Sequence, residues 1–399
     1  MNRPSSRRSW TVLALATAVL MGTASCGPTE DDAEEAGLGR HFSLAAAGDV
    51  LIHPQLTEQA RKDAKATGKG ANGLDFGPMM AGIKPVISKA DLAICHFEPV
   101  AAEPAGPYEG FPDFQVPPQI ATTLKDVGYD TCSTASNHTL DHGRAGVRRT
   151  LDALDAAGLR HTGSARSAAE ADKPLVLEVK GVKVAQLSYA FGFNGREVPE
   201  DTPWLANRTD FDAIKAAEKR ARAAGAEVVV LSIHWGREYH AEPSGAQVRL
   251  ARRIARETSI DLVVGHHAHV VQPMEKVDGT WIAYGLGNQI ARHDVPSGVT
   301  EEGVIGWFDF SERAGHWSVR ARYVPTVMVV PEDRGDDAPA KGAPSDHRLY
   351  DAAAELRAHH ELSGRQRARY RLAFERTEGT MLNRGADADG LRPLETLPG

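Results

Sequence analysis

The chain has 399 residues, of which 42% are hydrophobic and 25% charged, so it can bury a large core and is neither a disordered tail nor a fibre. Lys and Arg number 46 against 53 Asp and Glu, a net charge of −7, and no stretch beyond the N-terminus concentrates basic residues, which argues against a nucleic-acid binder. Three cysteines exclude a disulfide-dense scaffold and a four-thiolate zinc site, whereas 16 histidines are an unusually large number.

The first 25 residues have the pattern of an export signal. Basic residues precede an uncharged apolar run over residues 10–21, which is too short to span a bilayer and is followed by small residues. Residues 23–26 (Thr-Ala-Ser-Cys) resemble a bacterial lipobox with Thr in place of the usual Leu, so we expect cleavage before Cys26 and lipidation of its thiol. The alternative is a plain secreted signal. Arg7 and Arg8 also resemble a twin-arginine signal, so the export route stays open between the general and the twin-arginine pathway.

Composition also divides the rest of the chain. Cleavage after residue 25 leaves 43 Lys and Arg against 53 Asp and Glu, a net charge of −10. An acidic segment up to Arg40 suits a solvated tether. Near the C-terminus, an arginine-rich helical pattern that we expect to pack on the body precedes a tail, from Arg384, that we expect to be disordered. The predicted parts are a signal peptide (1–25), a tether (26–41), a folded domain (42–330), a linker (331–345) and a C-terminal helical segment with its tail (346–399).

Short β-rich runs alternate with amphipathic helical patterns across the predicted domain. The β-rich runs cover residues 42–48, 91–97, 129–135, 175–179, 182–189, 227–233, 261–265 and 281–284. The helical patterns cover residues 145–157, 210–224 and 245–257. The alternation predicts an α/β fold with a largely buried sheet, and a hairpin turn at Lys180-Gly181 predicts that the sheet is mixed.

Polar residues follow five of these runs, where an open α/β sheet usually binds its ligands. They are Asp49, Glu98, Asn137 with His138, His234, and the group His266, His267 and His269. Because successive residues of a strand point to opposite faces, a turn must follow residues 261–265 if His267 and His269 both point inward. The Gly-X-Ser-X-Gly motif and the phosphate-binding P-loop motif are absent from the sequence.

These residue types predict a pair of divalent cations. A shared carboxylate with imidazoles and an amide oxygen suits Mn, Fe or Zn ions held a few ångström apart, which is an arrangement that hydrolyses phosphoesters. Taken singly, each residue has an alternative role: Asp49 as a turn or helix cap, His234 as a hydrogen-bonded core histidine, and Asn137 as a turn residue. Their joint occurrence at strand ends favours the metal site.

Six motifs in chain order resemble the CapA family, the poly-gamma-glutamate capsule synthesis proteins of the calcineurin-like metallophosphoesterase superfamily. The motifs cover residues 48–50 (Gly-Asp-Val), 97–99 (Phe-Glu-Pro), 135–143, 234–239, 265–273 and 284–288 (Tyr-Gly-Leu-Gly-Asn). The resemblance extends over about residues 42–330. It implies a two-sheet sandwich flanked by helices, that is, an αββα arrangement with mixed sheets.

The resemblance also implies roles for single residues. The implied metal ligands are Asp49, Glu98 as the bridging carboxylate, Asn137, His234, His267 and His269. His138 matches the histidine that faces the substrate and assists the leaving group. Leu51 stands where a typical phosphoesterase has an imidazole, so the first metal is expected to bind more weakly. His53 is either a substitute ligand or a loop residue. His96 replaces the family's Asn and is either an extra ligand or a packed polar residue.

Three further polar residues have open roles. Glu238 could orient His234, contact the substrate or form a surface ion pair. Asn288 fits a residue that fixes a loop at the edge of the site. Asp141 could hold the imidazole of His138 in its productive tautomer or cap the helix that follows. Both of these roles of Asp141 fit the sequence equally well.

Cys95 and Cys132 lie near the ends of the strands that deliver Glu98 and Asn137. In an oxidising extracellular compartment they can pair if the two strands are neighbours. Two buried free thiols fit the sequence equally well.

Three functions therefore compete: an extracytoplasmic metal-dependent hydrolase, a factor that handles an anionic capsule or envelope polymer, and a polymer-binding lipoprotein in which the metals are structural or lost. The expected partners are an anionic polymer or phosphoester, the membrane through the lipid on Cys26, and other capsule synthesis proteins. A surface of net charge −10 repels a polyanion unless the site is locally positive through its metals and nearby arginines such as Arg237 and Arg292.

Overall fold

The computed structural model describes residues 39–293, 297–331, 345–358 and 362–397. The chain divides into residues 1–38 and a unit from Gly39 onward, and only the second falls within these ranges. The predicted signal peptide, most of the predicted tether, the predicted lipidation site Cys26 and nearly all of the predicted linker lie outside the described residues.

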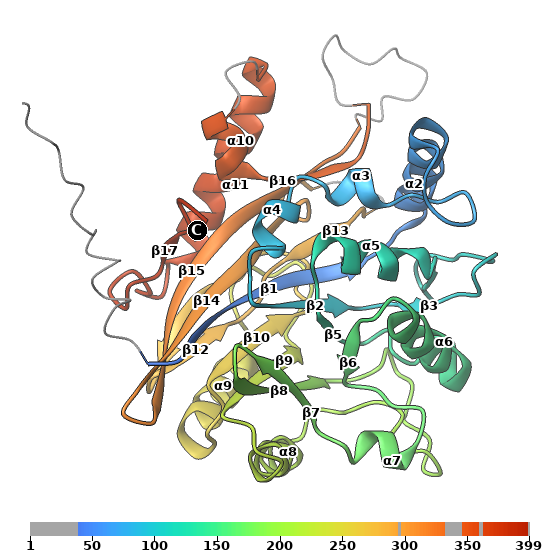
Figure 1. Cartoon of the computed structure of the whole chain (residues 1–399). Coiled ribbons are helices and arrows are strands. Elements are labelled where there is room, and N and C mark those ends of the chain that lie inside the picture. Colours follow the sequence, from blue (N-terminus) through green and yellow to red (C-terminus); the bar gives the residue numbers. More distant parts are fainter. Residues whose placement is uncertain (1–38, 294–296, 332–344, 359–361, 398–399) are drawn as a thin grey trace, which may run out of the picture. The chain divides into compact units, whose positions relative to one another are not determined.

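Two large β-sheets form the centre of the unit from Gly39 onward (Figure 1). The first sheet has, in spatial order, β16 (Arg348–Asp351), β15 (His316–Val329), β14 (Glu302–Arg313), β1 (His41–Leu51), β2 (Leu92–Phe97), β5 (Thr131–Ser133) and β6 (Arg160–Thr162), with β13 (Asn288–Ala291) beside β1 and β17 (Arg392–Pro393) beside β15. The second has β11 (Met274–Val277), β12 (Thr280–Ala283), β10 (Leu262–His266), β9 (Val228–His234), β8 (Val182–Ala190) and β7 (Leu175–Val179). A small third sheet pairs β3 (Val100–Ala101) with β4 (Gln115–Val116).

Both large sheets are mixed. In the first, β1, β2, β5 and β6 run parallel to one another, whereas β14, β15 and β16 pair antiparallel. In the second, β8, β9, β10 and β12 are parallel, and β7 and β11 are antiparallel to their neighbours. The predicted hairpin at Lys180-Gly181 is the β7–β8 connection, and both residues have the positive φ that a tight hairpin turn needs.

The two sheets face each other and share a hydrophobic core. Leu44 of β1 packs into the same cluster as Val228 and Val230 of β9. The intervening residues, such as Ala45 in β1 and Val229 in β9, belong to two other clusters on the outer faces. Because both faces of each sheet are buried, these strands are nearly continuous apolar runs.

Helices cover the outer faces. On the first sheet lie α2 (Pro54–Thr67), α3 (Gly77–Met80), α4 (Lys84–Ile87), α5 (Gln119–Val127) and α6 (Gly143–Ala156), and on the second α8 (Phe211–Ala223) and α9 (Gly245–Glu257). Figure 1 shows these groups, together with the short α7 (Ala168–Ala171) between β6 and β7. The result is the αββα sandwich that the CapA resemblance implies.

The C-terminal part differs from the sequence prediction. The long strands β14 and β15 were not predicted, and the predicted helix from residue 346 begins instead with β16, followed by α10 (Ala352–Ala358) and α11 (Gly364–Met381). The tail from Arg384 is ordered up to residue 397, because Leu391 and Leu394 are buried and β17 pairs with β15. The helices of the described ranges include none with the length and apolar character of a membrane span.

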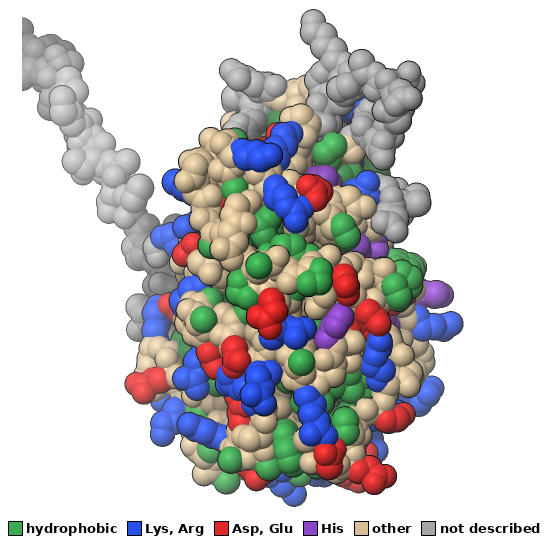
Figure 2. Space-filling view, turned by 90° about the vertical axis from the view of Figure 1, so that its right-hand side faces the viewer, with side chains coloured by type: hydrophobic (Ala, Val, Ile, Leu, Met, Phe, Trp, Pro, Cys, Tyr) green, Lys and Arg blue, Asp and Glu red, His purple; other side chains and the backbone are tan. Residues whose placement is uncertain are grey.

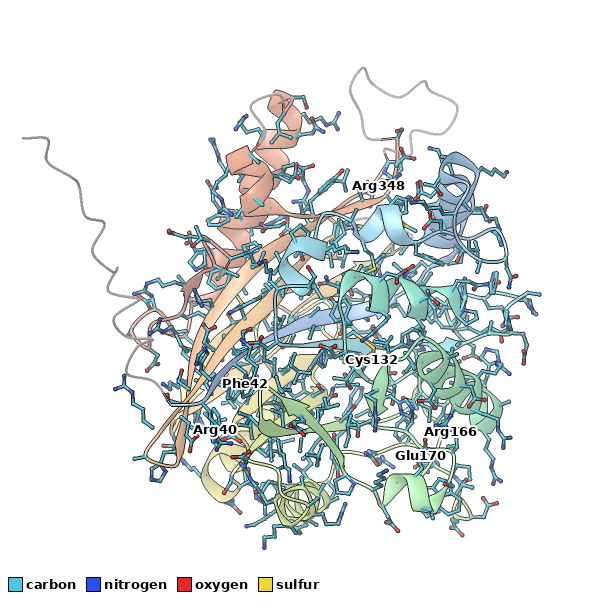
Figure 3. The ribbon with its side chains drawn as sticks, in the orientation of Figure 1. Arg40, Phe42, Cys132, Arg166, Glu170 and Arg348 are labelled. Atoms are coloured by element: carbon cyan, nitrogen blue, oxygen red, sulfur yellow. A yellow bond between two sulfur atoms is a disulfide. The ribbon has the colours of Figure 1, made fainter. Side chains whose placement is uncertain are left out.

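A disulfide joins neighbouring strands of the first sheet. Cys95 of β2 and Cys132 of β5 face each other in register, with Cα atoms 4.4 Å apart, and they form a disulfide (Figure 3). This resolves the choice that the sequence left open. The bond ties together the strands that lead to Glu98 and Asn137.

Candidate metal centre

The strand pairing brings the polar strand ends together. Asp49 of β1 lies opposite both His96 of β2 and Asn288 at the start of β13, in a register that is irregular around Asp49. On the second sheet, His234 at the end of β9 lies opposite His266 at the end of β10. The carboxyl ends of both sheets therefore supply side chains to one region.

Gly48 allows β1 to approach the loop before β13. A Cβ atom at Gly48 would lie 2.1 Å from the carbonyl oxygen of Gly287, a distance that real Cβ atoms do not reach. The backbone N–H of Asp49 donates to the same carbonyl at 2.9 Å. Only glycine at position 48 is therefore compatible with the place of Asp49 beside Asn288.

The described residues contain four overlapping groups that could hold a cation; one joins Asp49, His96 and His234, and two others share Glu98. Asp49, Glu98 and His269 make one group, and Glu98, His234 and His267 make the other; within each group the potential ligand atoms lie within 4.8 Å of one another. Asn137 joins them, because its Oδ1 lies 2.8 Å from Nε2 of His234. All six predicted ligands thus lie together, and Glu98 belongs to both groups.

Glu98 provides the test of whether a cation fits. The residue is fully buried, and neither carboxylate oxygen has a hydrogen-bond partner among the described residues. Its Oε1 lies 3.7 Å from Nε2 of His269 and 3.9 Å from Nε2 of His234, too far for hydrogen bonds. Two ligand atoms each about 2.1 Å from one tetrahedral metal lie roughly 3.4 Å apart, so these separations suit a shared cation.

A hydrogen-bond chain runs from Ser133 through His96 and His234 to Asn137. Oγ of Ser133 lies 2.8 Å from Nδ1 of His96, and Nε2 of His96 lies 3.0 Å from Nδ1 of His234. Nε2 of His234 is in turn hydrogen-bonded to Oδ1 of Asn137 at 2.8 Å. His96 is thus a hydrogen-bonded residue that holds His234, with both of its own nitrogens engaged.

The amide of Asn137 is oriented so that its oxygen also faces the centre. Its Nδ2 donates to Oδ1 of Asn194 at 3.1 Å, which leaves its Oδ1 to accept from Nε2 of His234 at 2.8 Å. A cation bound by His234 and Asn137 would take the place of the proton in this hydrogen bond.

Asn288 and His266 orient the ligands of the first group. The Nδ2 of Asn288 donates to the carbonyl oxygen of Thr300 at 2.9 Å, so its Oδ1 accepts from Nδ1 of His269 at 2.9 Å and leaves Nε2 of His269 toward Glu98. Nδ1 of His266 lies 3.2 Å from Oδ1 of Asp49. Asn288, which the sequence predicted to fix a loop, therefore also orients the candidate ligand His269.

A left-handed turn after β10 presents the paired histidines. His267 has φ +92° and His269 φ +55°, values that non-glycine residues rarely adopt. The backbone N–H of His267 donates to Oδ2 of Asp49 at 3.1 Å, and its Nδ1 is buried without a hydrogen-bond partner among the described residues. The predicted turn is present, and strained backbone of this kind clusters at functional sites.

Burial and neighbouring charges set the protonation of the cluster. Burial holds the pKa of His234 well below its usual range and lowers the pKa of His267 to about 3, so both imidazoles are neutral and can bind a cation. Burial likewise raises the pKa of Glu98 well above its usual range. Burial opposes charge on His269, but Glu98 and Asp49 outweigh it and raise the pKa of His269 to about 10.

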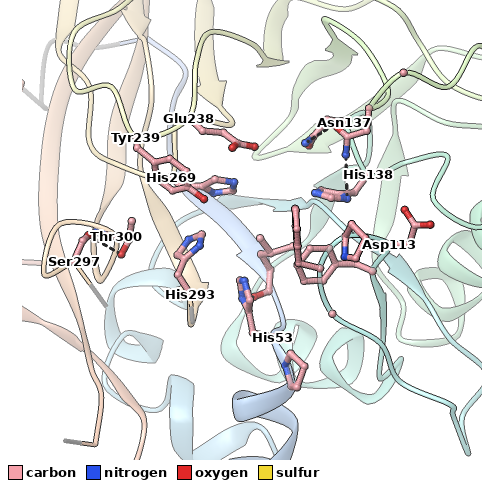
Figure 4. Close-up of a pocket in the computed structure, with 18 of the residues that line it drawn as sticks. His53, Asp113, Asn137, His138, Glu238, Tyr239, His269, His293, Ser297 and Thr300 are labelled. Carbon is pink, nitrogen blue, oxygen red and sulfur yellow. Dashed lines mark hydrogen bonds between the residues drawn. The ribbon is translucent and has the colours of Figure 1, made fainter. Parts of the chain in front are cut away.

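His138 lies beside this cluster without joining either group of ligands. Its Nδ1 donates to Oδ2 of Asp141 at 2.6 Å, and its ring lines the cavity described below (Figure 4). Asp141 also accepts from the backbone N–H of Phe114 at 2.8 Å. The N-cap residue of α6 is His142, so Asp141 orients His138 and does not cap the helix.

Replacement of His96 by alanine is expected to lower metal affinity by about 10-fold to 100-fold, because His234 loses the hydrogen-bond partner that fixes its orientation. Competition with a chromogenic chelator measures this affinity. His316→Ala, on the exposed β14–β15 hairpin, is the matched control. Unchanged affinity would contradict the orienting role, and complete loss of metal would make His96 a ligand.

A cavity of about 1100 Å³ opens beside the cluster. Figure 4 shows Asn137, His138, Glu238 and His269 pointing into it. Glu238 is also within 4.8 Å of the ligand atoms of His267 and His269, which places it at the centre and not in an ion pair with Arg237. The two arginines expected to make the site positive, Arg237 and Arg292, are not among its lining residues.

Two predicted alternatives for His53 are decided by its contacts. The residue is buried, lines the cavity and precedes α2, and its Nδ1 accepts from the backbone N–H of Arg292 at 3.1 Å. It belongs to none of the groups of ligand atoms among the described residues. His53 therefore does not replace the imidazole missing at Leu51.

Sequence reasoning missed two polar residues of the site and gave a third no role. Asn194 and Arg196, which follow β8, line the cavity, and His266, which the sequence placed at a strand end, contacts Asp49. The same strand-end rule, applied to β8, points to the loop that holds Asn194 and Arg196. The wall formed by Phe111 and Phe114 lies in a loop between two short strands and carries no sequence signal of its own.

Comparisons with known proteins agree with the motifs. The family described as "Bacterial capsule synthesis protein PGA_cap" matches residues 43–293. The chain is 34% identical over 170 residues to the PGA biosynthesis protein CapA of Bacillus subtilis (strain 168), covering 41% of this chain and 43% of that protein. It is 27% identical over 254 residues to the capsule biosynthesis protein CapA of Bacillus anthracis, covering 62% and 59%. The chain thus spans about half the length of these relatives.

Solved structures with a related fold include phosphoesterases. The calcineurin-like phosphoesterase YfkN from Bacillus subtilis is 14% identical, with a TM-score of 0.40, covering 86% of this chain and 98% of that chain. A phosphatase from Mycoplasma pneumoniae is also 14% identical, with a TM-score of 0.42, covering 72% and 94%. Likeness of this degree is too low to transfer chemistry. The match over residues 43–293, in contrast, covers most of the folded unit, and this chain belongs to the bacterial capsule synthesis protein PGA_cap family, in agreement with its resemblance to the CapA proteins.

Proposed function

We propose that the protein is a metal-dependent hydrolase of phosphoesters that acts outside the cytoplasm in the synthesis, export or anchoring of an anionic capsule or envelope polymer. The observation that carries the hydrolase is Glu98, a buried carboxylate without hydrogen-bond partners that is shared by two groups of ligand atoms. The names of the relatives, which refer to PGA and capsule biosynthesis, support the polymer pathway.

Different residues of the site would have different roles in the reaction. Asp49, Glu98, Asn137, His234, His267 and His269 would hold two divalent cations, for which Mn, Fe and Zn are candidates. When bound, such ions supply a nucleophilic water at neutral pH and neutralise charge on the phosphoryl oxygens. His138, whose Nδ1 is held by Asp141, keeps its other nitrogen for donating a proton to the leaving oxygen.

A second candidate, a non-catalytic polymer factor, is favoured by one observation. Leu51 is buried and lines the cavity where the superfamily resemblance implies an imidazole, and His53 does not replace it. One of the two cations would therefore have fewer protein ligands. A protein of this kind could hold a polymer through its metals without cleaving it.

Metal analysis of the purified protein combined with an assay on a chromogenic phosphodiester separates these functions. Stoichiometric metal together with turnover that a chelator abolishes supports the hydrolase. Metal without turnover supports the polymer factor, and a protein that contains and binds no metal supports the polymer-binding lipoprotein. Restoration of activity by added Mn, Fe or Zn identifies the active ion.

Lipid anchoring is tested at Cys26. We expect Cys26→Ala to move the protein from the membrane fraction to the soluble fraction. The thiol that accepts the lipid is lost, so the chain has no lipid with which to bind the membrane. Immunoblotting of fractionated cells measures the distribution, with Ser25→Ala as the matched control. Continued membrane attachment of the Cys26 variant would disprove the lipoprotein.

A further inference from the structure

Large hydrophobic side chains remain exposed around the candidate metal centre. Phe111 (80% exposed), Tyr239 (56%) and Val299 (37%) line the cavity, and Phe191 (45%) has its ring centroid 4.8 Å from that of His267. Among the residues that the structure describes, only one other large hydrophobic side chain, on α11, is comparably exposed. Scattered exposed apolar residues are ordinary, but their concentration around one cavity marks a surface that contacts a ligand.

Aromatic side chains come from two different walls of this cavity. Phe111 lies in the loop between β3 and β4, next to Asp113, and Tyr239 lies in the loop after β9. Figure 4 places Asp113 and Tyr239 on opposite sides, with His138 and His269 between them. Tyr239 is held in place by its backbone, with φ +62° and an N–H that donates to the carbonyl oxygen of Ala268 at 2.7 Å.

The cavity has more room than a phosphate group requires. Its volume of about 1100 Å³ is in the range of sites that enclose whole organic ligands. Flat apolar or aromatic groups gain from stacking against Phe and Tyr rings. The walls therefore suit the organic part of a ligand whose phosphate lies at the cluster of Glu98, His234 and His269.

The charges of the walls oppose a ligand with many carboxylates. Arg196 is the only lysine or arginine among the described residues that line the cavity, and it is already paired, through Nη2 with Asp113 at 2.5 Å and through Nη1 with Asp141 at 3.3 Å. Glu238 adds a further carboxylate to the lining. Figure 2 shows acidic and basic side chains interspersed over one face of the unit, not a basic track. Bound cations can neutralise the charge of a single phosphate, but they cannot neutralise a run of carboxylates along the cavity.

We propose that this cavity takes a phosphodiester with a planar or apolar ring on one of its ester groups, the ring lying between Phe111 and Tyr239 and the phosphate over the metal ligands. This names the substrate class of the proposed hydrolase and rests on that function. The polyglutamate chain itself is then not the ligand of this cavity.

Two phosphonates that resist hydrolysis test the proposal by binding alone. With the metal-loaded protein, calorimetry is expected to show phenylphosphonate binding about 3-fold to 10-fold more tightly than methylphosphonate. Phe111→Ala is expected to bring this ratio close to one without weakening methylphosphonate. Because Phe111 is 80% exposed, its removal leaves the core intact. Leu372→Ala, an equally simple removal of an exposed side chain on α11, should keep the wild-type ratio.

Equal affinity of the two phosphonates for the wild-type protein would overturn the proposal. So would binding of a short poly-gamma-glutamate more tightly than phenylphosphonate, or an unchanged ratio in both Phe111→Ala and Tyr239→Ala. A separate turnover assay compares phenyl and methyl p-nitrophenyl phosphate, which share one leaving group. Ring-selective binding without turnover of either ester would reject the hydrolase and keep the ligand class. Turnover without ring preference would reject only the ligand class. Failure to bind metal would reject both proposals.

Discussion

Replacing His138 by alanine is expected to lower turnover of a phosphodiester by about 10²-fold to 10⁴-fold, while metal content stays near that of the wild type. The reason is geometric: His138 is outside the groups of ligand atoms, lines the cavity, and has its Nδ1 committed to Asp141 at 2.6 Å. Loss of a proton donor slows departure of the leaving oxygen without removing a ligand. Steady-state kinetics and metal analysis on the same preparation measure both quantities.

The leaving group sharpens this test. The loss should be larger for an ester that releases phenol than for one that releases p-nitrophenol, because p-nitrophenolate leaves readily without a proton. His267→Ala is the matched variant: it removes an imidazole with a buried, unpartnered Nδ1 and should lower metal content itself. Equal metal loss in both variants would make His138 a ligand. Turnover unchanged by His138→Ala would exclude it from the reaction.

Replacing Glu98 by glutamine is expected to abolish metal binding and, in the presence of a chelator, to increase the free energy of unfolding by about 1–3 kcal/mol. Within the described part of the chain, neither oxygen of this fully buried carboxylate has a hydrogen-bond partner, and burial raises its pKa well above the usual range. Glutamine keeps the shape of this side chain but cannot ionise, so the folded protein no longer carries the cost of a buried carboxylate. With saturating metal the order reverses, since only the wild type gains stability from binding.

The sign of the pH dependence follows from the raised pKa. As pH rises above the ordinary value of 4.5, the unfolded chain loses the Glu98 proton before the folded chain does. The metal-free wild type therefore loses stability relative to Glu98→Gln as pH rises, until the folded-state pKa is passed. Urea denaturation in chelator at several pH values measures this difference.

Glu302 provides the matched control for this prediction. It is also buried, but it forms ion pairs with Arg369 and Arg376. Glu302→Gln should therefore destabilise the protein in chelator, because two guanidinium groups lose their charged partner. Destabilisation of similar size by Glu98→Gln would mean that Glu98 is satisfied without a cation, and the metal centre would be wrong.

Local patterns predicted the elements whose burial is complete. Strands such as β9 and β10 are buried on both faces, so nearly all of their residues are apolar. The first polar residue after such a run marks the end of the strand and can be recognised in the sequence. Asp49, Glu98 and His234 were found in this way, as was the turn that presents His267 and His269. The helix at 245–257 has the bounds expected from its pattern.

Other elements were missed where the local pattern is weak or shared. The end of β14 and the first half of β15 mix residues of different exposure, and β16 is only four residues long. The tail after Arg384 is polar, and it is ordered because Leu391 and Leu394 pack into hydrophobic clusters formed by strands that are distant in the sequence. Propensity does not decide such segments, since tertiary contacts outweigh it.

The sequence by itself determined the α/β alternation, the family and which side chains at strand ends can bind a cation, because these depend on residue type and on burial along single strands. Only the tertiary structure decided that His96 orients His234, that Asp141 holds His138, and that Phe111 and Tyr239 face the same cavity. These relations join residues from different strands and loops. They exist only after two sheets have packed face to face, and no local pattern specifies which loops then meet.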